Sequence, residues 1–375
     1  MELQQEHTSN GASKNVSNIA PEEGIVNAIK RINREQSAKY IADLPRLDAY
    51  MAKHPTRLVC LKCMDGRVHL SAMTGAPLGR VTPFRAIGGA FRPAWPAFMK
   101  RMTTLAQGAR ARLNRGELGR IAVLVSFHYS RSDKNLCCAG WKHDTQAAQA
   151  HARWLADELR VVYGDYIDFI VLGVETDLDE LELHGPNGVV SGVACHNLSE
   201  TEIFDRIRVA FPHLDLQTAR DLAPLMAGNA KHVQEVASRT RSLCETHHAE
   251  RVIALGQGFD WMATRNIALI VNDFDTNCDG AIVTACRIIM KNMGVTLASN
   301  ADVVLFSNIK YKVDADGLDR RQAEARARDL RREAVQYIKQ GIPEFLATGR
   351  VYYLVGVTNE RTKECSFLEE GPLAA

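Results

Sequence analysis

The sequence predicts an α/β protein in which one unit of strands and helices occurs twice. Apolar runs of strand length alternate with helical patterns along most of the 375 residues, which is typical of mainly parallel sheets with helices packed on them. The runs follow the same order in both halves, and those beginning at Ile121 and Ile167 are spaced almost as those beginning at Val303 and Val351. This agreement indicates an internal duplication.

Each copy should contribute four strands to its sheet. The strands expected in the first copy are Leu58–Cys63, Val81–Ile87, Ile121–Phe127 and Ile167–Val174. Those expected in the second copy are Val252–Leu255, Ile267–Val271, Val303–Ser307 and Val351–Val357. Between the third and fourth strands, each copy carries a strong helical pattern, which begins at Thr145 in the first copy and at Arg321 in the second.

The segments outside the two copies also have distinct patterns. Residues 1 to about 20 are rich in Ser, Asn, Gln and Gly and predict a mobile tail. Residues 22–51 predict a helical arm that Pro45 interrupts. The connector at about 185–249 is helical, with a capping box at Ser199–Glu202. We therefore divide the chain into a tail and arm at 1–54, a first copy with its connector at 55–249, and a second copy at 250–375.

Composition and charge exclude several classes of protein. The hydrophobic content of 46% and the net charge of +2 are ordinary for a globular protein, and such a charge gives no reason to expect nucleic-acid or membrane partners. No apolar run approaches the roughly 18 residues of a membrane span. The N-terminus lacks the features of a secretion signal, and nine cysteines in a chain of this length do not suggest a disulfide framework. The sequence favours a cytoplasmic protein.

Residues that bind metals lie at the ends of two predicted strands. Cys63 ends the first run, with Asp65 and Arg67 two and four residues later, and His128 ends the third run, followed by the pair Cys137–Cys138. Two thiolates and an imidazole form a ligand set that zinc prefers, and a site with three protein ligands leaves a fourth position for water, as in catalytic sites. The spacing alone leaves open which cysteine of the pair is the third ligand.

The second copy lacks these residues. When the two copies are aligned, Gln257 stands at the position of Cys63 and Ile309 at the position of His128. Neither side chain can replace the ligand that it stands for. The sequence therefore predicts one metal site per chain.

Three segments together resemble the β-class carbonic anhydrases: Cys63-Met-Asp65-Gly-Arg67, Arg85-Ala-Ile-Gly-Gly89, and His128 followed by Cys138-Ala-Gly140. The long insertion between His128 and Cys138, together with one intact and one degenerate copy, is similar to the carboxysomal shell branch of that family. The resemblance covers about residues 55 to 360. It implies two domains of that family's fold joined as an intrachain pseudo-dimer, with a homodimer of such chains as a further option.

The resemblance also implies a function. It predicts a carbonate dehydratase, in which Zn²⁺ bound by Cys63, His128 and Cys138 supplies the hydroxide that converts CO₂ to bicarbonate and a proton. Asp65 and Arg67 would be the catalytic dyad that controls the fourth zinc position. Cys138 is chosen over Cys137 because the Ala-Gly that follows it matches the family's turn. The carboxysome becomes an alternative to the cytoplasm.

Two other functions compete with this one. A zinc enzyme acting on a CO₂ analogue, carbonyl sulfide or carbon disulfide, would have the same ligands. A non-catalytic zinc-binding scaffold is disfavoured, because a structural site has no need of Asp65 and Arg67. A redox pair of Cys60 and Cys63 is also disfavoured, because both lie in a predicted strand rather than at the start of a helix.

Further residues near the motifs have roles that the sequence does not decide. Arg85 is either part of the site or a salt-bridge partner at the edge of the sheet. His69 and His143 are candidate proton shuttles, although a lone histidine near a turn is more often simply solvated. The pair His247–His248 lies outside the expected strand ends, and we interpret it as incidental.

Overall fold

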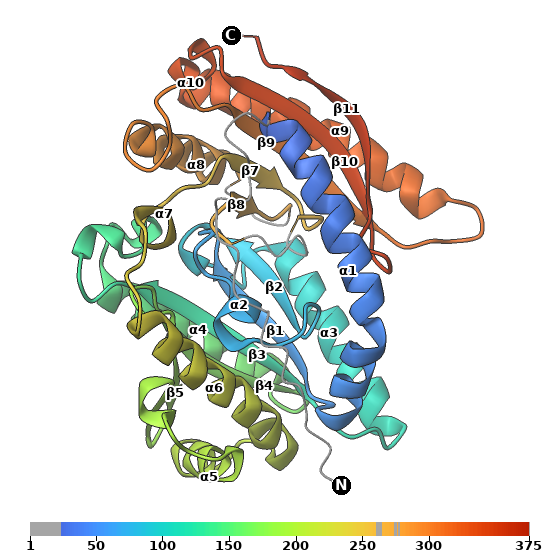
Figure 1. The fold of residues 1–375 in the computed structure, drawn as a ribbon. Coiled ribbons are helices and arrows are strands. Elements are labelled where there is room, and N and C mark those ends of the chain that lie inside the picture. Colours follow the sequence, from blue (N-terminus) through green and yellow to red (C-terminus); the bar gives the residue numbers. More distant parts are fainter. Residues whose placement is uncertain (1–23, 260–264, 274–275, 277, 375) are drawn as a thin grey trace, which may run out of the picture.

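The computed structural model describes residues 24–259, 265–273, 276 and 278–374. The predicted tail at residues 1 to about 20 lies outside the described residues. Two sheets with flanking helices make up the molecule (Figure 1), so the predicted α/β class with mainly parallel sheets is confirmed. No helix in the described part of the chain combines the length and the hydropathy needed to cross a membrane.

The first sheet has six strands in the order β2-β1-β3-β4-β5-β6. The strands from β2 to β4 are parallel, whereas β5 and β6 are antiparallel to their neighbours. Their bounds are β1 (Arg57–Cys63), β2 (Val81–Ala86), β3 (Ile121–Tyr129), β4 (Ile167–Glu175), β5 (Glu180–Gly185) and β6 (Gly188–Ser191).

The second sheet has five strands in the order β11-β10-β9-β7-β8. From β8 to β11 it repeats the order of the first sheet from β2 to β5, including the three parallel pairs and the antiparallel last pair. The bounds are β7 (Val252–Leu255), β8 (Ala268–Val271), β9 (Val303–Tyr311), β10 (Val351–Asn359) and β11 (Cys365–Pro372).

All eight predicted strands are present, and the differences lie at their ends and in three further strands. β3 extends through His128, and β9 extends through Ile309, so these residues lie within strands rather than after them. The expected equivalence of Ile309 with His128 is wrong by one residue. Cys60 of β1 pairs with Leu124, and its equivalent Ala254 of β7 pairs with Phe306, so Lys310 is equivalent to His128. The apolar pattern did not reveal β5, β6 and β11, which carry few consecutive apolar residues. In β5 only some positions are buried, and β11 is mostly half-buried or exposed and ends in Gly371 and Pro372.

Alternating side chains of the first sheet pack against helices on its two faces. Leu58 and Cys60 of β1 join the cluster formed with α5 and α6, whereas Val59 and Leu61 join the cluster formed with α3 and α4. This alternation follows from the two-residue period of a strand, and burial on both faces explains why β1 is an unbroken apolar run. The helices are α1 (Ile25–Lys53), α2 (Leu70–Thr74), α3 (Pro96–Asn114), α4 (Thr145–Tyr163), α5 (Glu200–Ala210), α6 (Leu216–Ala237), α7 (Leu243–Thr246), α8 (Cys278–Asn292), α9 (Leu318–Gly341) and α10 (Pro343–Ala347).

The arm is one long helix, so the break expected at Pro45 is wrong. α1 is continuous from Ile25 to Lys53 with Pro45 inside it. Pro45 is exposed, and water can therefore satisfy the carbonyl that loses its helical partner. The start of α1 packs on the second sheet through Ile25 and Ile29, and the helix then runs on towards the first sheet (Figure 1).

The two sheets meet where β1 and β2 approach β8. The Ile270 N–H donates to the carbonyl of Met64 at 3.0 Å, and the Arg85 N–H donates to Asn272 Oδ1. Cys63 and Met64 belong to the same buried cluster as Leu255 of the second sheet. The strand end with the expected metal ligand therefore lies at the junction of the two halves.

Candidate metal centre

Three of the predicted ligands lie together. Cys63 comes from the last position of β1, His128 from β3, and Cys138 from the segment between β3 and α4. The ligand atoms of all three side chains lie within 4.8 Å of one another, and all three residues are buried. The parallel pairing of β1 with β3 explains the first two positions, because it brings the carboxyl ends of these strands to one edge.

The geometry of this cluster fits a tetrahedral metal. The sulfur atoms of Cys63 and Cys138 are 3.8 Å apart, and both cysteines are free thiols. Two sulfurs that each lie about 2.3 Å from a tetrahedral zinc ion are also separated by about 3.8 Å. Both ring nitrogens of His128 are buried without a hydrogen-bond partner among the described residues. An unpartnered buried imidazole is costly, and a metal ion would provide the missing partner.

The two thiols already influence each other without a metal. A hydrogen bond from Cys138 lowers the pKa of Cys63 well below its ordinary value, and the same bond, with burial, raises the pKa of Cys138. One thiolate is thus favoured, and the second is opposed by the charge of the first. A bound cation would remove that opposition and allow both sulfurs to act as ligands.

The structure brings Cys138, rather than Cys137, to the cluster. The sulfur of Cys137 instead accepts hydrogen bonds from the Ser130 N–H at 3.4 Å and from Thr145 Oγ1 at 3.5 Å. These contacts fasten the segment after β3 to the start of α4. Cys137 is thereby a neighbour of the site and not a member of it.

Asp65 and Arg67 form a buried ion pair beside the cluster. The Nη2 atom of Arg67 donates to Asp65 Oδ2 at 2.7 Å and its Nε to Oδ1 at 3.1 Å, which is the strong two-pronged geometry. Asp65 Oδ2 is 3.7 Å from His128 Nε2. Burial opposes ionisation of Asp65, but the charges of Arg67 and the nearby histidines outweigh it and hold its pKa well below the usual range. Arg67 also donates to the carbonyls of Thr246 and Leu136, each at 3.0 Å.

Arg85 and Gly66 hold the backbone of the same loop. Arg85 is buried and donates to the carbonyl of Asp65 at 3.0 Å, so it contacts the loop that carries the ion pair. A Cβ at Gly66 would lie 2.7 Å from the carbonyl oxygen of Ala268. Glycine is therefore required there, because the second half packs directly on the loop.

The interpretation of His248 as incidental is wrong. Its Nε2 lies 3.5 Å from Arg67 Nη2 and 3.8 Å from Asp65 Oδ2, and its Nδ1 lies 3.0 Å from Glu250. Burial opposes protonation of His248, but Glu250 raises its pKa above the ordinary value. Sequence reasoning missed both residues because they precede β7, whereas functional residues were sought after strands. The paired His-x-Glu just before a strand was the only local signal.

The other candidates have separate roles. His69 caps α2 by accepting a hydrogen bond from the Ala72 N–H, and burial lowers its pKa to about 3. His143 Nδ1 donates to the carbonyl of Cys137 at 2.9 Å. Cys60 is fully buried within β1, and burial raises its pKa to about 11, which agrees with the argument against a redox pair.

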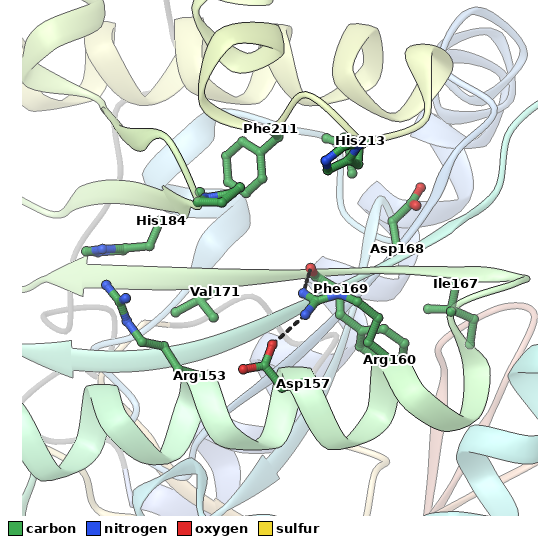
Figure 2. Close-up of a pocket in the computed structure, with 14 residues that line it drawn as sticks. Arg153, Asp157, Arg160, Ile167, Asp168, Phe169, Val171, His184, Phe211 and His213 are labelled. Atoms are coloured by element: carbon green, nitrogen blue, oxygen red, sulfur yellow. Dashed lines mark hydrogen bonds and ion pairs between the residues drawn. The ribbon is translucent and has the colours of Figure 1, made fainter.

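A separate cavity of about 460 Å³ lies on the outer part of the first sheet (Figure 2). Phe169 and Val171 of β4 face it, with Arg153 of α4 on one side and Phe211 on the other. None of the three cluster residues lines this cavity. It is therefore distinct from the candidate metal centre.

Comparison with known proteins points in the same direction as the geometry. No family model matches the chain. The chain is 26% identical over 181 residues to a carboxysome shell carbonic anhydrase of Hydrogenovibrio crunogenus, and the match covers 40% of this chain. It spans about a third (34%) of that relative's length. The relationship to carbonic anhydrases of the carboxysomal shell branch, which the motifs predict, is thus supported by a distant relative that bears this name.

Proposed function

We propose that this chain is a zinc-dependent carbonic anhydrase that interconverts CO₂ and bicarbonate. The observation that carries the proposal is a buried Cys63–His128–Cys138 cluster beside an Asp65–Arg67 pair that is not part of it. Support also comes from the name of the distant relative. A zinc ion at such a site lowers the pKa of its bound water from about 16 to about 7, which makes a nucleophile available at neutral pH.

The Asp65–Arg67 pair has a defined task in this proposal. Held by Arg67, the Asp65 carboxylate keeps Oδ2 3.7 Å from His128 Nε2, where it could accept a hydrogen bond from the attacking water and orient it. Without Arg67, the same carboxylate would be free to take the fourth metal position. A structural metal site has no use for a buried ion pair with this orientation, so the scaffold function is the weaker alternative.

The surroundings of the cluster suit an apolar substrate. Cys63, Cys138 and the buried Met64 belong to a large apolar cluster that includes residues of the second half, and Ile87 and Trp141 pack against that apolar cluster. CO₂ carries no charge, so apolar side chains favour its binding. The same side chains do not favour the binding of charged bicarbonate. Binding that does not favour the product allows bicarbonate to leave.

We also propose that the two halves are duplicated domains, at 55–249 and 250–375, that form an intrachain pseudo-dimer with one zinc site. The shared strand order from β2 to β5 and from β8 to β11 supports this. Gln257 and Lys310, at the positions equivalent to Cys63 and His128, support the loss of the second site.

Stopped-flow CO₂ hydration by metal-quantified protein tests the function. Zinc-loaded protein should hydrate CO₂, and chelated protein should not. Carbonyl sulfide and carbon disulfide are assayed in parallel. Turnover of either analogue without CO₂ hydration would replace the proposed substrate, and zinc-loaded protein inactive on all three would favour the scaffold.

A further inference from the structure

Glu250 reaches the site from the second half of the chain. Its side chain is fully buried just before β7. The Gly66 N–H donates to its Oε1 at 3.0 Å, and His248 Nδ1 lies 3.0 Å from its Oε2. One carboxylate thus contacts both the loop with the ion pair and the histidine that faces that pair.

This contact determines the tautomer of His248. A carboxylate accepts hydrogen bonds and cannot donate them, so the proton of the neutral imidazole must sit on Nδ1. Nε2 is then an acceptor, and it lies 3.5 Å from the donor Arg67 Nη2. The opposite tautomer would place an N–H of His248 against an N–H of Arg67.

The neighbouring charges favour a hydrogen-bonded chain over a second metal site. Ligand atoms of Asp65, His248 and Glu250 lie within 4.8 Å of one another. However, Asp65 already accepts three hydrogen bonds from the Arg67 side chain, and the guanidinium occupies the place where a cation would bind.

We propose that Glu250 is a positioning residue for the Asp65–Arg67 pair. It fixes the loop through the Gly66 N–H, and it fixes the tautomer of His248, which then offers an acceptor to Arg67. The inference rests on the proposed function, because the pair has a catalytic task only there. The second half would accordingly contribute to turnover without binding metal itself.

Glu250→Gln separates the two contacts. The glutamine carbonyl can still accept from the Gly66 N–H at the position of Oε1, which lies 3.1 Å from Nδ1. The atom at the position of Oε2, 3.0 Å from Nδ1, becomes an amide that can only donate. This donor opposes a proton on Nδ1, so we expect the tautomer of His248 to reverse. We expect zinc content and thermal stability near those of the wild type, a 10- to 100-fold lower kcat, and an altered pH profile. Imidazole ¹⁵N shifts should report the reversal, with the His248 signal identified by its loss in His248→Gln.

Two further measurements isolate the effect. Glu245→Gln is the matched control, because Glu245 caps α7 and pairs with Arg239. In this variant the ¹⁵N signal of His248 and the kcat should be those of the wild type. If Glu250 acts through His248, adding Glu250→Gln to His248→Ala should cost far less than it costs alone.

Several outcomes would overturn the inference. One is a Glu250→Gln variant with the kcat and the pH profile of the wild type. Another is a double variant of His248→Ala and Glu250→Gln in which the losses of kcat are additive. A wild-type His248 whose neutral imidazole carries its proton on Nε2 is decisive even if Glu250→Gln fails to fold. If the wild type does not hydrate CO₂, the proposed function fails, and the tautomer measurement still tests the contact on its own.

Discussion

The carboxyl ends of the two sheets share a topology but not a chemistry. At the first sheet, Cys63 and His128 meet Cys138 in a buried cluster. At the second, the equivalent residues Gln257 and Lys310 line a cavity of about 390 Å³ together with Asp273, and the amide nitrogen of Gln257 has no partner within the described part of the chain. The comparison teaches that strand order brings positions together, and that the side chains at those positions decide whether a site exists.

The second half still contacts the loop that carries Asp65 and Arg67. It does so through β8 and through the segments that precede β7 and β8. Asn266 and Ile270 donate backbone hydrogen bonds to the carbonyls of Gly66 and Met64, and Thr246 accepts one from Arg67. The half without the Cys63–His128–Cys138 cluster thus packs against the half that contains it.

The largest expected effect is the loss of metal in Cys63→Ser. The wild type should bind about one zinc ion per chain, and the variant should bind almost none and be inactive. The matched change in the second half, Gln257→Ser, should leave the zinc content unchanged. Metal analysis checks both, and a wild-type content near two would contradict the difference between the halves.

Replacing the two adjacent cysteines separately should give opposite results. Cys138→Ser should lose zinc, because the sulfur of Cys138 belongs to the cluster. Cys137→Ser should keep zinc and lose some stability, because that thiol forms hydrogen bonds with Ser130 and Thr145 and does not belong to the cluster. Zinc content and thermal unfolding measure the two effects. Loss of zinc from the Cys137 variant alone would reverse the assignment.

Arg67→Ala should lower CO₂ hydration by about 10- to 100-fold or more while zinc is retained. Asp65 would lose the partner that holds it away from the metal, and the deficit should shrink as pH rises because hydroxide then competes better for the fourth position. Arg67→Lys keeps the charge but not the two-pronged contact, so its rate of CO₂ hydration should lie between those of the wild type and Arg67→Ala. Full activity of Arg67→Ala with full zinc would remove the dyad from the mechanism.

Gly66→Ala should weaken the contact between the halves by about 1–3 kcal/mol. The new Cβ would lie 2.7 Å from the Ala268 carbonyl and 3.0 Å from Glu250 Oε1, so the loop or the second half must shift. Gly108→Ala is the control, because Gly108 lies within α3 and a Cβ added there would meet no neighbouring atom of the described residues within 4 Å. This variant should gain up to about 1 kcal/mol in the free energy of unfolding. Denaturant unfolding measures both, and equal stabilities would show that the two halves pack less tightly at this loop.

The last expected effect is a pH dependence that belongs to the first half and emerges only below neutral pH. Burial, followed by the charges of Lys62 and Arg85, lowers the pKa of His69 to about 3, so the unfolded chain binds a proton that the folded chain refuses. The contribution of His69 to the free energy of unfolding is complete above pH about 6.5. It declines as the pH falls below that value, by about 2 kcal/mol at pH 5. His69→Asn keeps a cap for α2 without titrating, and its stability should fall less steeply between pH 7 and 5. Exposed His213→Asn serves as the control, and parallel profiles for His69→Asn and the wild type would contradict the prediction.

Local sequence determined most of the elements and the members of the cluster. The apolar run ending at Cys63 and the run containing His128 predict strands because burial on both faces demands consecutive apolar residues. The short antiparallel strands β5 and β11 were missed, because half-buried strands with polar positions resemble loops in sequence. The break expected at Pro45 was wrong, because proline on the solvent face of a helix costs little when the other face is packed.

Only the tertiary structure decided which distant residues complete the site. His248 and Glu250 lie about 180 residues after the Asp65–Arg67 loop that they contact, and nothing in their own segment reports the loop against which they fold. The same holds for the requirement for glycine at position 66 and for Cys138 rather than Cys137 in the cluster. Periodicity and strand ends can be read locally because they depend on near neighbours, whereas these contacts depend on how the two halves pack.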